Sequence, residues 1–192
     1  MQWRSSLFHS AVGILLLSFA VQPGTKAQEP ERITIQANAV GTGTQLGKLF
    51  PTKIIINQVS SPEDQQALLE GFKRSGHQGM LKALTNMKPK GRIALEGRVG
   101  NDVKYIRELP STNGRRFRLV TDRNLAFGEL YENTRSRDYD IGGAEVVVTP
   151  DGKGTGTLLP ACKLKLNKKK ELEIETYQNP WKLDHFIVTK GD

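Results

Sequence analysis

Hydrophobic and polar residues alternate over most of this chain with a period of two. The clearest case begins at Glu31, where Ile33, Ile35 and Ala37 fall on one side of an extended chain and polar residues fall on the other. This alternation is typical of a half-buried β-strand. Weaker forms of the pattern predict further strands at 52–59, 92–99, 103–109, 115–121, 145–149, 157–166, 171–177 and 182–189.

One segment has helical spacing instead. Two serines precede Pro62, and Glu63 and Asp64 follow in what becomes the first turn, where the helix dipole favours acids. A helix is therefore expected to start here and to end near Gly76. Apolar residues at positions 80, 81, 84 and 87 repeat the helical spacing before Pro89 stops it. The segment predicts two short helices joined at 75–78.

Short connections between the strands decide the expected fold class. Turn-forming pairs stand in the gaps at 101–102, 113–114 and 151–152. Successive strands with such connections favour an antiparallel sheet. We therefore expect an α+β fold: a mainly antiparallel β-sheet meander, curled into a barrel or a sandwich, with an inserted pair of short helices. The segment 122–143 shows no clear pattern.

Residues 1–27 have the order of a cleavable signal peptide. A positive charge at Arg4 precedes an apolar run at 11–21, and the segment ends on Ala27. Spanning a bilayer takes about 20 apolar residues, so a membrane anchor is disfavoured. We expect a single domain over 28–192, exported to the periplasm or the extracellular space and not spanning a membrane. Its oligomeric state stays open.

Charge and cysteine content narrow the function classes. The chain has a formal net charge of +8, and loss of Arg4 and Lys26 with the leader lowers it to +6. A basic protein favours anionic partners without naming one. Cys162 is the only cysteine, so no internal disulfide can form, and its apolar surroundings predict a buried, inert thiol.

Common catalytic motifs do not occur. The glycines and lysine of 41–48 have the wrong spacing for a phosphate-binding loop. Only His77 and His185 lie after the leader, neither in a zinc-binding or hydrolase motif, and both are expected to be ordinary surface or rim residues. Asp184 precedes His185 directly, and strand neighbours point to opposite faces. We expect no metal and no cofactor. Carboxylates that only the fold could bring together are Glu96, Glu108, Glu129, Asp138, Asp140 and Glu145.

Lysines are concentrated in two stretches. In 163–170, Lys163 and Lys165 are followed by glutamates at 171, 173 and 175, so a hairpin there would pair its own charges across strands. By contrast, no acidic residue occurs from Gly71 through Leu95. The candidate binding residues of this second stretch are Lys73, Arg74, Lys82, Lys88, Lys90 and Arg92. Arginines at 115, 116 and 118 are candidates to extend it.

Two interpretations of the second stretch stay open. It is either a solvated helix face balanced by acids elsewhere in the fold, or a surface for an anionic lipid or polymer. Phe72 is the only aromatic residue there, which argues against specific nucleic-acid recognition. Trp181 is expected to close the core and not to line a cleft.

The leading functional hypothesis is a non-catalytic binding module for an anionic envelope component or a small ligand. Its motivation is the basic charge balance together with the missing catalytic motifs. A secreted hydrolase is the first alternative, with Glu or Asp assisted by His185 or Tyr139. The second alternative is a structural subunit of an envelope complex.

Overall fold

The computed structural model describes residues 31–125, 139–168, 172–176 and 179–191, so the predicted leader lies outside the described residues. The strands are β1 Arg32–Val40, β2 Leu49–Ile56, β3 Gly91–Leu95, β4 Asn101–Leu109, β5 Arg115–Thr121, β6 Ile141–Val148, β7 Gly154–Leu166, β8 Leu172–Thr176 and β9 Trp181–Gly191. A 3₁₀ turn, η1, covers Gly43–Gln45, and the helix α1 covers Pro62–Asn86.

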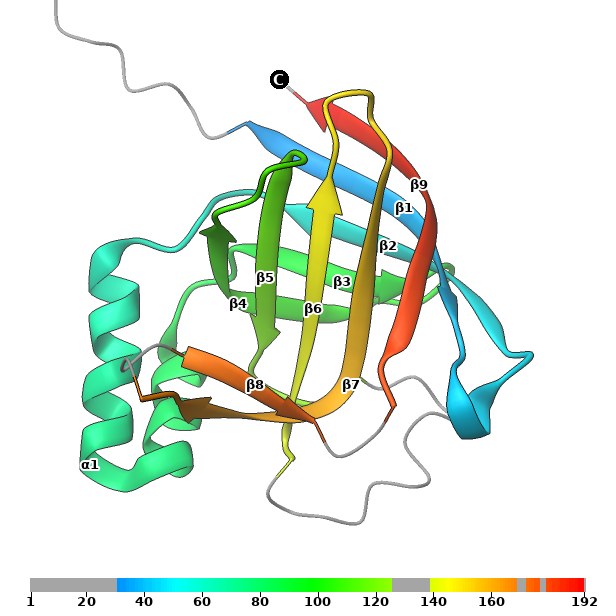
Figure 1. Ribbon diagram of the computed structural model, residues 1–192. Helices are drawn as coiled ribbons and strands as arrows, with labels where there is room; N and C mark the ends of the chain where they lie inside the picture. The colour runs from blue at the N-terminus through cyan, green and yellow to red at the C-terminus, as the bar shows by residue number, and fades with distance from the viewer. Residues whose placement is uncertain (1–30, 126–138, 169–171, 177–178, 192) are drawn as a thin grey trace, which may run out of the picture.

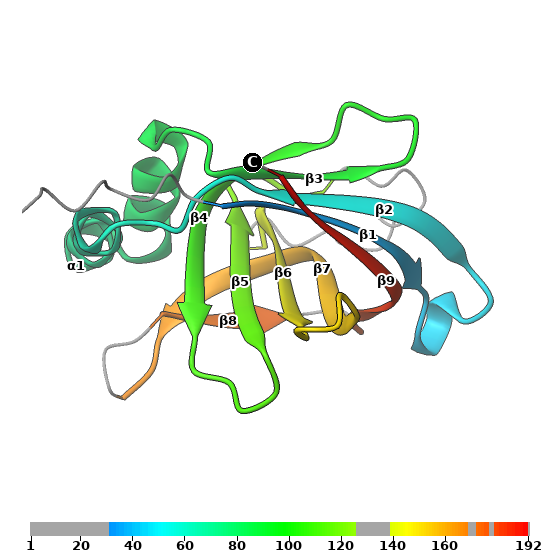
Figure 2. The same cartoon turned by 90° about the horizontal axis from the view of Figure 1, so that it is seen from above.

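The strands form a closed antiparallel barrel, one of the two predicted arrangements. Neighbours run in the order β6, β5, β4, β3, β2, β1, β9 and β7, and pairing of β6 with β7 closes the ring (Figure 1). The end of β7 leaves the ring and pairs with β8. Figure 2 shows the barrel from above, with α1 to one side. The fold is therefore mainly antiparallel β, as expected.

Apolar side chains fill the inside of the barrel. The alternation in β1 turns Ile33, Ile35 and Ala37 inward, where they meet buried residues of the other ring strands. Trp181 is fully buried in this core, and its ring lies 5.6 Å from that of Phe50. The prediction that the tryptophan closes the core is confirmed. Eight strands enclose just enough space for such a filling.

A second apolar core lies between the outside of the barrel and α1. Leu68, Met80 and Leu84 of the helix pack with Tyr105 of β4 and with Cys162 of β7. The cysteine is fully buried, as predicted, and burial raises the pKa of its thiol to about 12, with a smaller contribution from Asp140. The thiol is therefore protonated and unreactive at neutral pH.

The start of α1 agrees with the prediction. The Ser61 side chain accepts a hydrogen bond from the Asp64 amide, the Asp64 carboxylate accepts one from the Ser61 amide, and Pro62 opens the helix. The predicted pair of short helices is not confirmed as two elements. α1 is one element whose backbone leaves the helical region at Ser75 and at Gly76, where φ is 58°.

Most strand boundaries differ from the predicted ones by a few residues. β6 starts at Ile141 and not at 145, and β4 starts at Asn101, so the pair 101–102 that was expected in a turn lies in a strand. β3 ends at Leu95 and not at 99, because Glu96 and Gly97 form a turn in which Gly97 has a φ of 75°. β2 ends at Ile56, and the next residue donates its amide to the carbonyl of Lys90. Val59 and Val99, which extended the two predicted strands, are exposed and lie outside β2 and β3.

Candidate functional site

The structure separates the six predicted basic residues into two sets. Lys90 is buried, and its ammonium nitrogen lies 2.8 Å from the Asp64 carboxylate. Arg92 donates to the carbonyl of Val99 at 2.6 Å and lies 3.8 Å from Asp102. For these two residues, acids from elsewhere in the fold supply the balance that the local sequence lacks.

The other four residues, Lys73, Arg74, Lys82 and Lys88, are exposed on α1 and just after it. We call them the α1 cation group. None of them has an ion pair within the described parts of the chain. The kink at Ser75 and Gly76 divides α1 into a first and a second arm. Arg74 and Lys82 line a hollow of about 650 Å³ between these two arms. The acids that share this hollow, Glu63, Asp64 and Glu70, all lie on the first arm.

Cations on the barrel differ from the α1 cation group, because most of them lie within 4 Å of a carboxylate. Lys163 and Lys165 lie 3.3 and 3.5 Å from Glu175, and their strands pair as predicted for a self-compensated hairpin. Further barrel pairs among the described residues are Arg115 with Glu108 and Glu31, Arg116 and Arg118 with Glu145, Lys104 and Arg123 with Asp122, Lys153 with Asp151, Lys182 with Asp184, and Lys190 with Glu31. The arginines of β5 therefore do not extend the α1 cation group.

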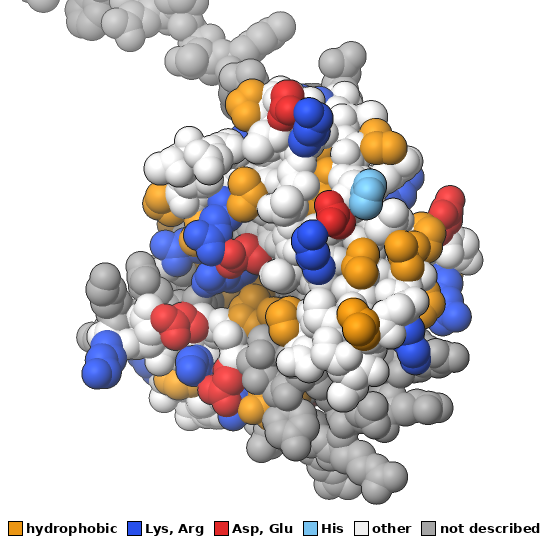
Figure 3. All heavy atoms as spheres, turned by 45° about the vertical axis from the view of Figure 1, so that its right-hand side comes forward, with side chains coloured by type: hydrophobic (Ala, Val, Ile, Leu, Met, Phe, Trp, Pro, Cys, Tyr) orange, Lys and Arg blue, Asp and Glu red, His pale blue; other side chains and the backbone are white. Residues whose placement is uncertain are grey.

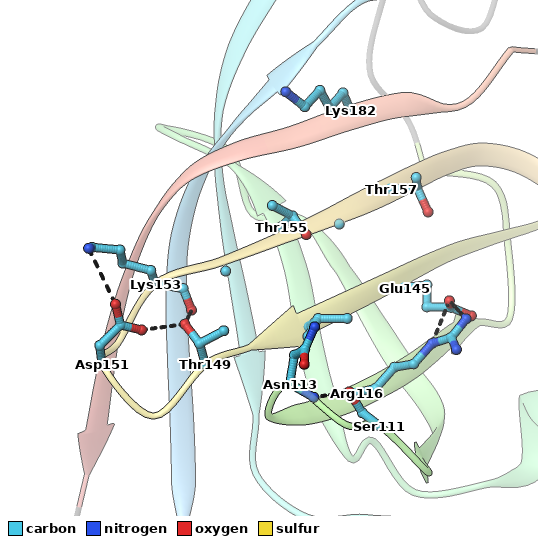
Figure 4. Close-up of a pocket in the computed structure, with 13 residues that line it drawn as sticks. Ser111, Asn113, Arg116, Glu145, Thr149, Asp151, Lys153, Thr155, Thr157 and Lys182 are labelled. Carbon is cyan, nitrogen blue, oxygen red and sulfur yellow. Dashed lines mark hydrogen bonds and ion pairs between the residues drawn. The ribbon is translucent and has the colours of Figure 1, made fainter.

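A wide hollow of about 970 Å³ crosses the outer face of β5, β6, β7 and β9. Figure 4 shows Thr155 and Thr157 rising from β7, with the pair of Arg116 and Glu145 on one side and Lys182 on the other. Burial acts to raise the pKa of Glu145, but hydrogen bonds from Arg116 and Arg118 outweigh it and hold that pKa below its ordinary value. This hollow offers hydroxyl groups and cations that each lie within 4 Å of a carboxylate, so its attraction for an anion is reduced.

His77 is a half-buried rim residue that pairs with a carboxylate from the barrel. Its Nε2 lies 2.6 Å from the Asp140 carboxylate, and its Nδ1 is buried with no hydrogen-bond partner in the described structure. The pair joins the kink of α1 to the start of β6. Its side chains are mostly covered, which suits a structural link between helix and barrel.

His185 is exposed, as predicted. Its position relative to Asp184 differs from the predicted one. The pairing of β1 with β9 shifts register between Gln36 and Asn38, and His185 has a φ of 54°. Its backbone amide donates to the Asp184 carboxylate at 2.9 Å, and its Nδ1 lies 4.0 Å from the same oxygen. The expectation of opposite faces is wrong because a β-bulge interrupts the alternation.

Among the described residues, the candidate carboxylates do not converge on one common partner. Glu108, Glu145 and Asp140 are held by different basic partners, and Tyr139 donates to Glu175 at 3.1 Å. Glu129 and Asp138 lie outside the described residues. Among the residues that the structure describes, no group of three or more histidines, cysteines and acids is placed to hold a metal ion.

Comparison with known proteins adds no family. The chain matches no protein-family model, no curated protein and no solved structure. In the described ranges, no helix has both the length and the apolar character to cross a membrane.

Proposed function

We propose that this protein is an exported, non-catalytic binding protein for an anionic envelope component, and that it uses the α1 cation group. The expected ligand is a polymer or a lipid surface with closely spaced negative charges. The leader-like segment at 1–27 supports export.

One contrast carries the proposal. Barrel cations are mostly neutralised by carboxylates within 4 Å, whereas Lys73, Arg74, Lys82 and Lys88 lie on α1 or just after it without such partners among the described residues. Exposed, unpaired cations attract anions over about 8 to 10 Å at physiological salt. Their binding releases counterions, so affinity should fall as salt rises.

The test compares binding to heparin and to vesicles of phosphatidylglycerol at 50 and 200 mM salt. Replacing all four residues of the α1 cation group by Gln should weaken binding at least roughly tenfold at low salt and flatten the salt dependence. The heparin and vesicle arms distinguish a polymer from a lipid surface.

A matched variant controls for net charge. Lys153, Lys165, Lys182 and Lys190 are exposed lysines of the barrel, each close to a carboxylate. Their joint replacement by Gln removes the same formal charge, and we expect it to weaken binding far less. Equal losses in the two variants would leave only a net-charge effect and would refute the proposed surface.

A further inference from the structure

A cleft of about 500 Å³ lies over the outer face of β1, β2, β3 and β9. Gln36 and Asn38 of β1 line it together with Lys53 of β2, and Glu96 and Arg98 come from the turn after β3. Its volume is within the range of small-molecule sites, about 300–1,000 Å³. Figure 3 brings the β9 side of the barrel forward and shows hydrophobic and charged side chains mixed on that surface.

The β-bulge places His185 in this cleft. Gln36 stands opposite Ile187 and Asn38 opposite Asp184, so β9 has two residues where β1 has one. Of these two, Phe186 turns into the core, whereas the His185 side chain is 78% exposed and lines the cleft. His185 is the only residue other than glycine with a positive φ in the described chain. Such a conformation costs on the order of 1 kcal/mol and is enriched at functional sites.

The charges of the cleft are not internally balanced. Neither Lys53 nor Arg98 has an ion pair with another described residue, in contrast to Lys182 on the neighbouring strand, which lies 2.7 Å from Asp184. Among the described residues, Glu96 is the only acid that lines the cleft. Two cations against one carboxylate leave a positive site, and the amides of Gln36 and Asn38 add neutral hydrogen-bonding groups.

An apolar surface adjoins these polar groups. Ile187 lines the cleft and is 62% exposed, and Pro51, which also lines it, is exposed. A short hydrocarbon chain on this surface would remove apolar area from water, which stabilises binding by about 25 cal/mol per Å². The cleft thus combines cationic, amide and apolar contacts within one small volume.

We propose that this cleft binds a small organic anion: a carboxylate or phosphate monoester that carries a short apolar chain. Lys53 and Arg98 contact the anionic group, His185 and the β1 amides contact its remaining oxygens, and Ile187 contacts the chain. The site is separate from the α1 cation group, so either proposal can fail without the other.

The test is titration calorimetry, with nuclear magnetic resonance spectra of the backbone amides and the His185 ring, using hexanoate, hexyl phosphate, inorganic phosphate and hexanol as probes. We expect hexyl phosphate or hexanoate to bind and to shift the resonances of His185, Lys53 and Arg98. Inorganic phosphate should bind more weakly than hexyl phosphate, and hexanol should not bind. The two hexyl anions distinguish a phosphate ligand from a carboxylate ligand.

Variants assign the contacts. Lys53→Gln combined with Arg98→Gln should weaken binding roughly tenfold, as expected for loss of charge-assisted hydrogen bonds. Ile187→Ser should weaken the binding of the hexyl anions several-fold and leave the affinity for inorganic phosphate unchanged. His185→Asn removes the imidazole while tolerating the left-handed backbone, and should also weaken binding.

Lys153→Gln combined with Lys190→Gln is the matched control, since both lysines are exposed and lie outside the cleft. This control and the four-residue α1 variant should both bind hexyl phosphate like the unchanged protein. The proposal would be overturned if neither hexyl anion bound at 10 mM, which is roughly the weakest affinity expected of a specific site. Unchanged affinity in the Lys53 and Arg98 double variant, or equal affinity for inorganic and hexyl phosphate, would overturn it as well.

Discussion

The ammonium group of Lys90 lies 2.8 Å from the Asp64 carboxylate, and these side chains are only 11% and 20% exposed. Asp64 is in the first turn of α1, and Lys90 directly precedes β3. The ion pair therefore joins the start of α1 to the segment that leads from the helix back into the barrel. The same carboxylate accepts a hydrogen bond from the amide of Ser61 at 2.9 Å, so one side chain both caps α1 and holds the residue that precedes β3.

Asp64→Asn should lower the free energy of unfolding by about 2 kcal/mol at pH 7, because a charged hydrogen bond is lost and Lys90 stays covered. Burial acts to raise the pKa of Asp64, but hydrogen bonds from Lys90 and Ser61 outweigh it and lower that pKa. This stability is present above the unfolded pKa of about 3.9 and is lost as pH falls through the folded value. Urea unfolding at pH 7 and pH 3 measures the change.

The difference between Asp64→Asn and the unchanged protein should shrink at pH 3. Glu70→Gln is the control, since Glu70 is exposed on the same helix and should change stability by less than about 0.5 kcal/mol. A difference of the same size at both pH values would contradict an ionic contribution from Asp64.

Glu145→Gln should destabilise the barrel by roughly 1–2 kcal/mol, because it leaves Arg116 and Arg118 side by side on β5 without their shared carboxylate. Glu108→Gln is the matched change on the neighbouring strand. The Glu108 pair with Arg115 is more exposed, so its loss should cost less than about 1 kcal/mol. Guanidinium unfolding at pH 7 compares the two, and an equal or larger loss for Glu108→Gln would count against the proposed ranking.

Gly79→Ala should separate the two arms of α1. An added Cβ at this position would overlap the backbone carbonyl of Gly71, which lies on the other arm. We expect a loss of about 2 kcal/mol or more, since backbone cannot give way as a flexible side chain does. Thermal unfolding followed by circular dichroism measures it. Gln78→Ala, an exposed neighbour, should be close to neutral; comparable losses in both variants would rule out the close approach as the cause.

Cys162 should not react with a thiol reagent such as DTNB in the folded protein at pH 8, and should react fully once guanidinium unfolds the chain. With a folded pKa of about 12 and an unfolded value near 8.5, the thiol ionises first in the unfolded chain. Stability should therefore fall as pH rises from about 8.5 toward 12, and Cys162→Ala should lack this contribution. Rapid labelling of the folded protein would show that the thiol is accessible.

Local patterns were sufficient where the decisive interactions are local. The alternation in β1 predicted its inward face, β5 was predicted with its observed bounds, and the cap at Ser61 and Pro62 located the start of α1. The charge alternation of Lys163 and Lys165 also predicted their pairing with the strand that follows. Each of these features depends on residues close together in the chain, so a short window of sequence contains the needed information.

The candidate sites needed the tertiary structure. Six basic residues looked alike in sequence, and only the fold placed Asp64 beside Lys90 and Asp102 beside Arg92. Strict alternation predicted that His185 and Asp184 point to opposite faces. The three-residue step between the inward Leu183 and Phe186 was a local sign of the bulge. The cleft of His185 also requires β1, β2 and the turn after β3, which are distant in the chain.

The sequence by itself determined that this chain forms antiparallel strands around one helical insertion, because side-chain alternation and helix capping act over a few residues. Closure of the sheet into a barrel was decided by the tertiary structure, where β7 pairs with β6, β8 and β9. Strand pairing and charge neutralisation depend on which distant segments meet. For that reason, only the folded chain distinguishes the exposed cations of α1 and of the His185 cleft from those already paired with a carboxylate.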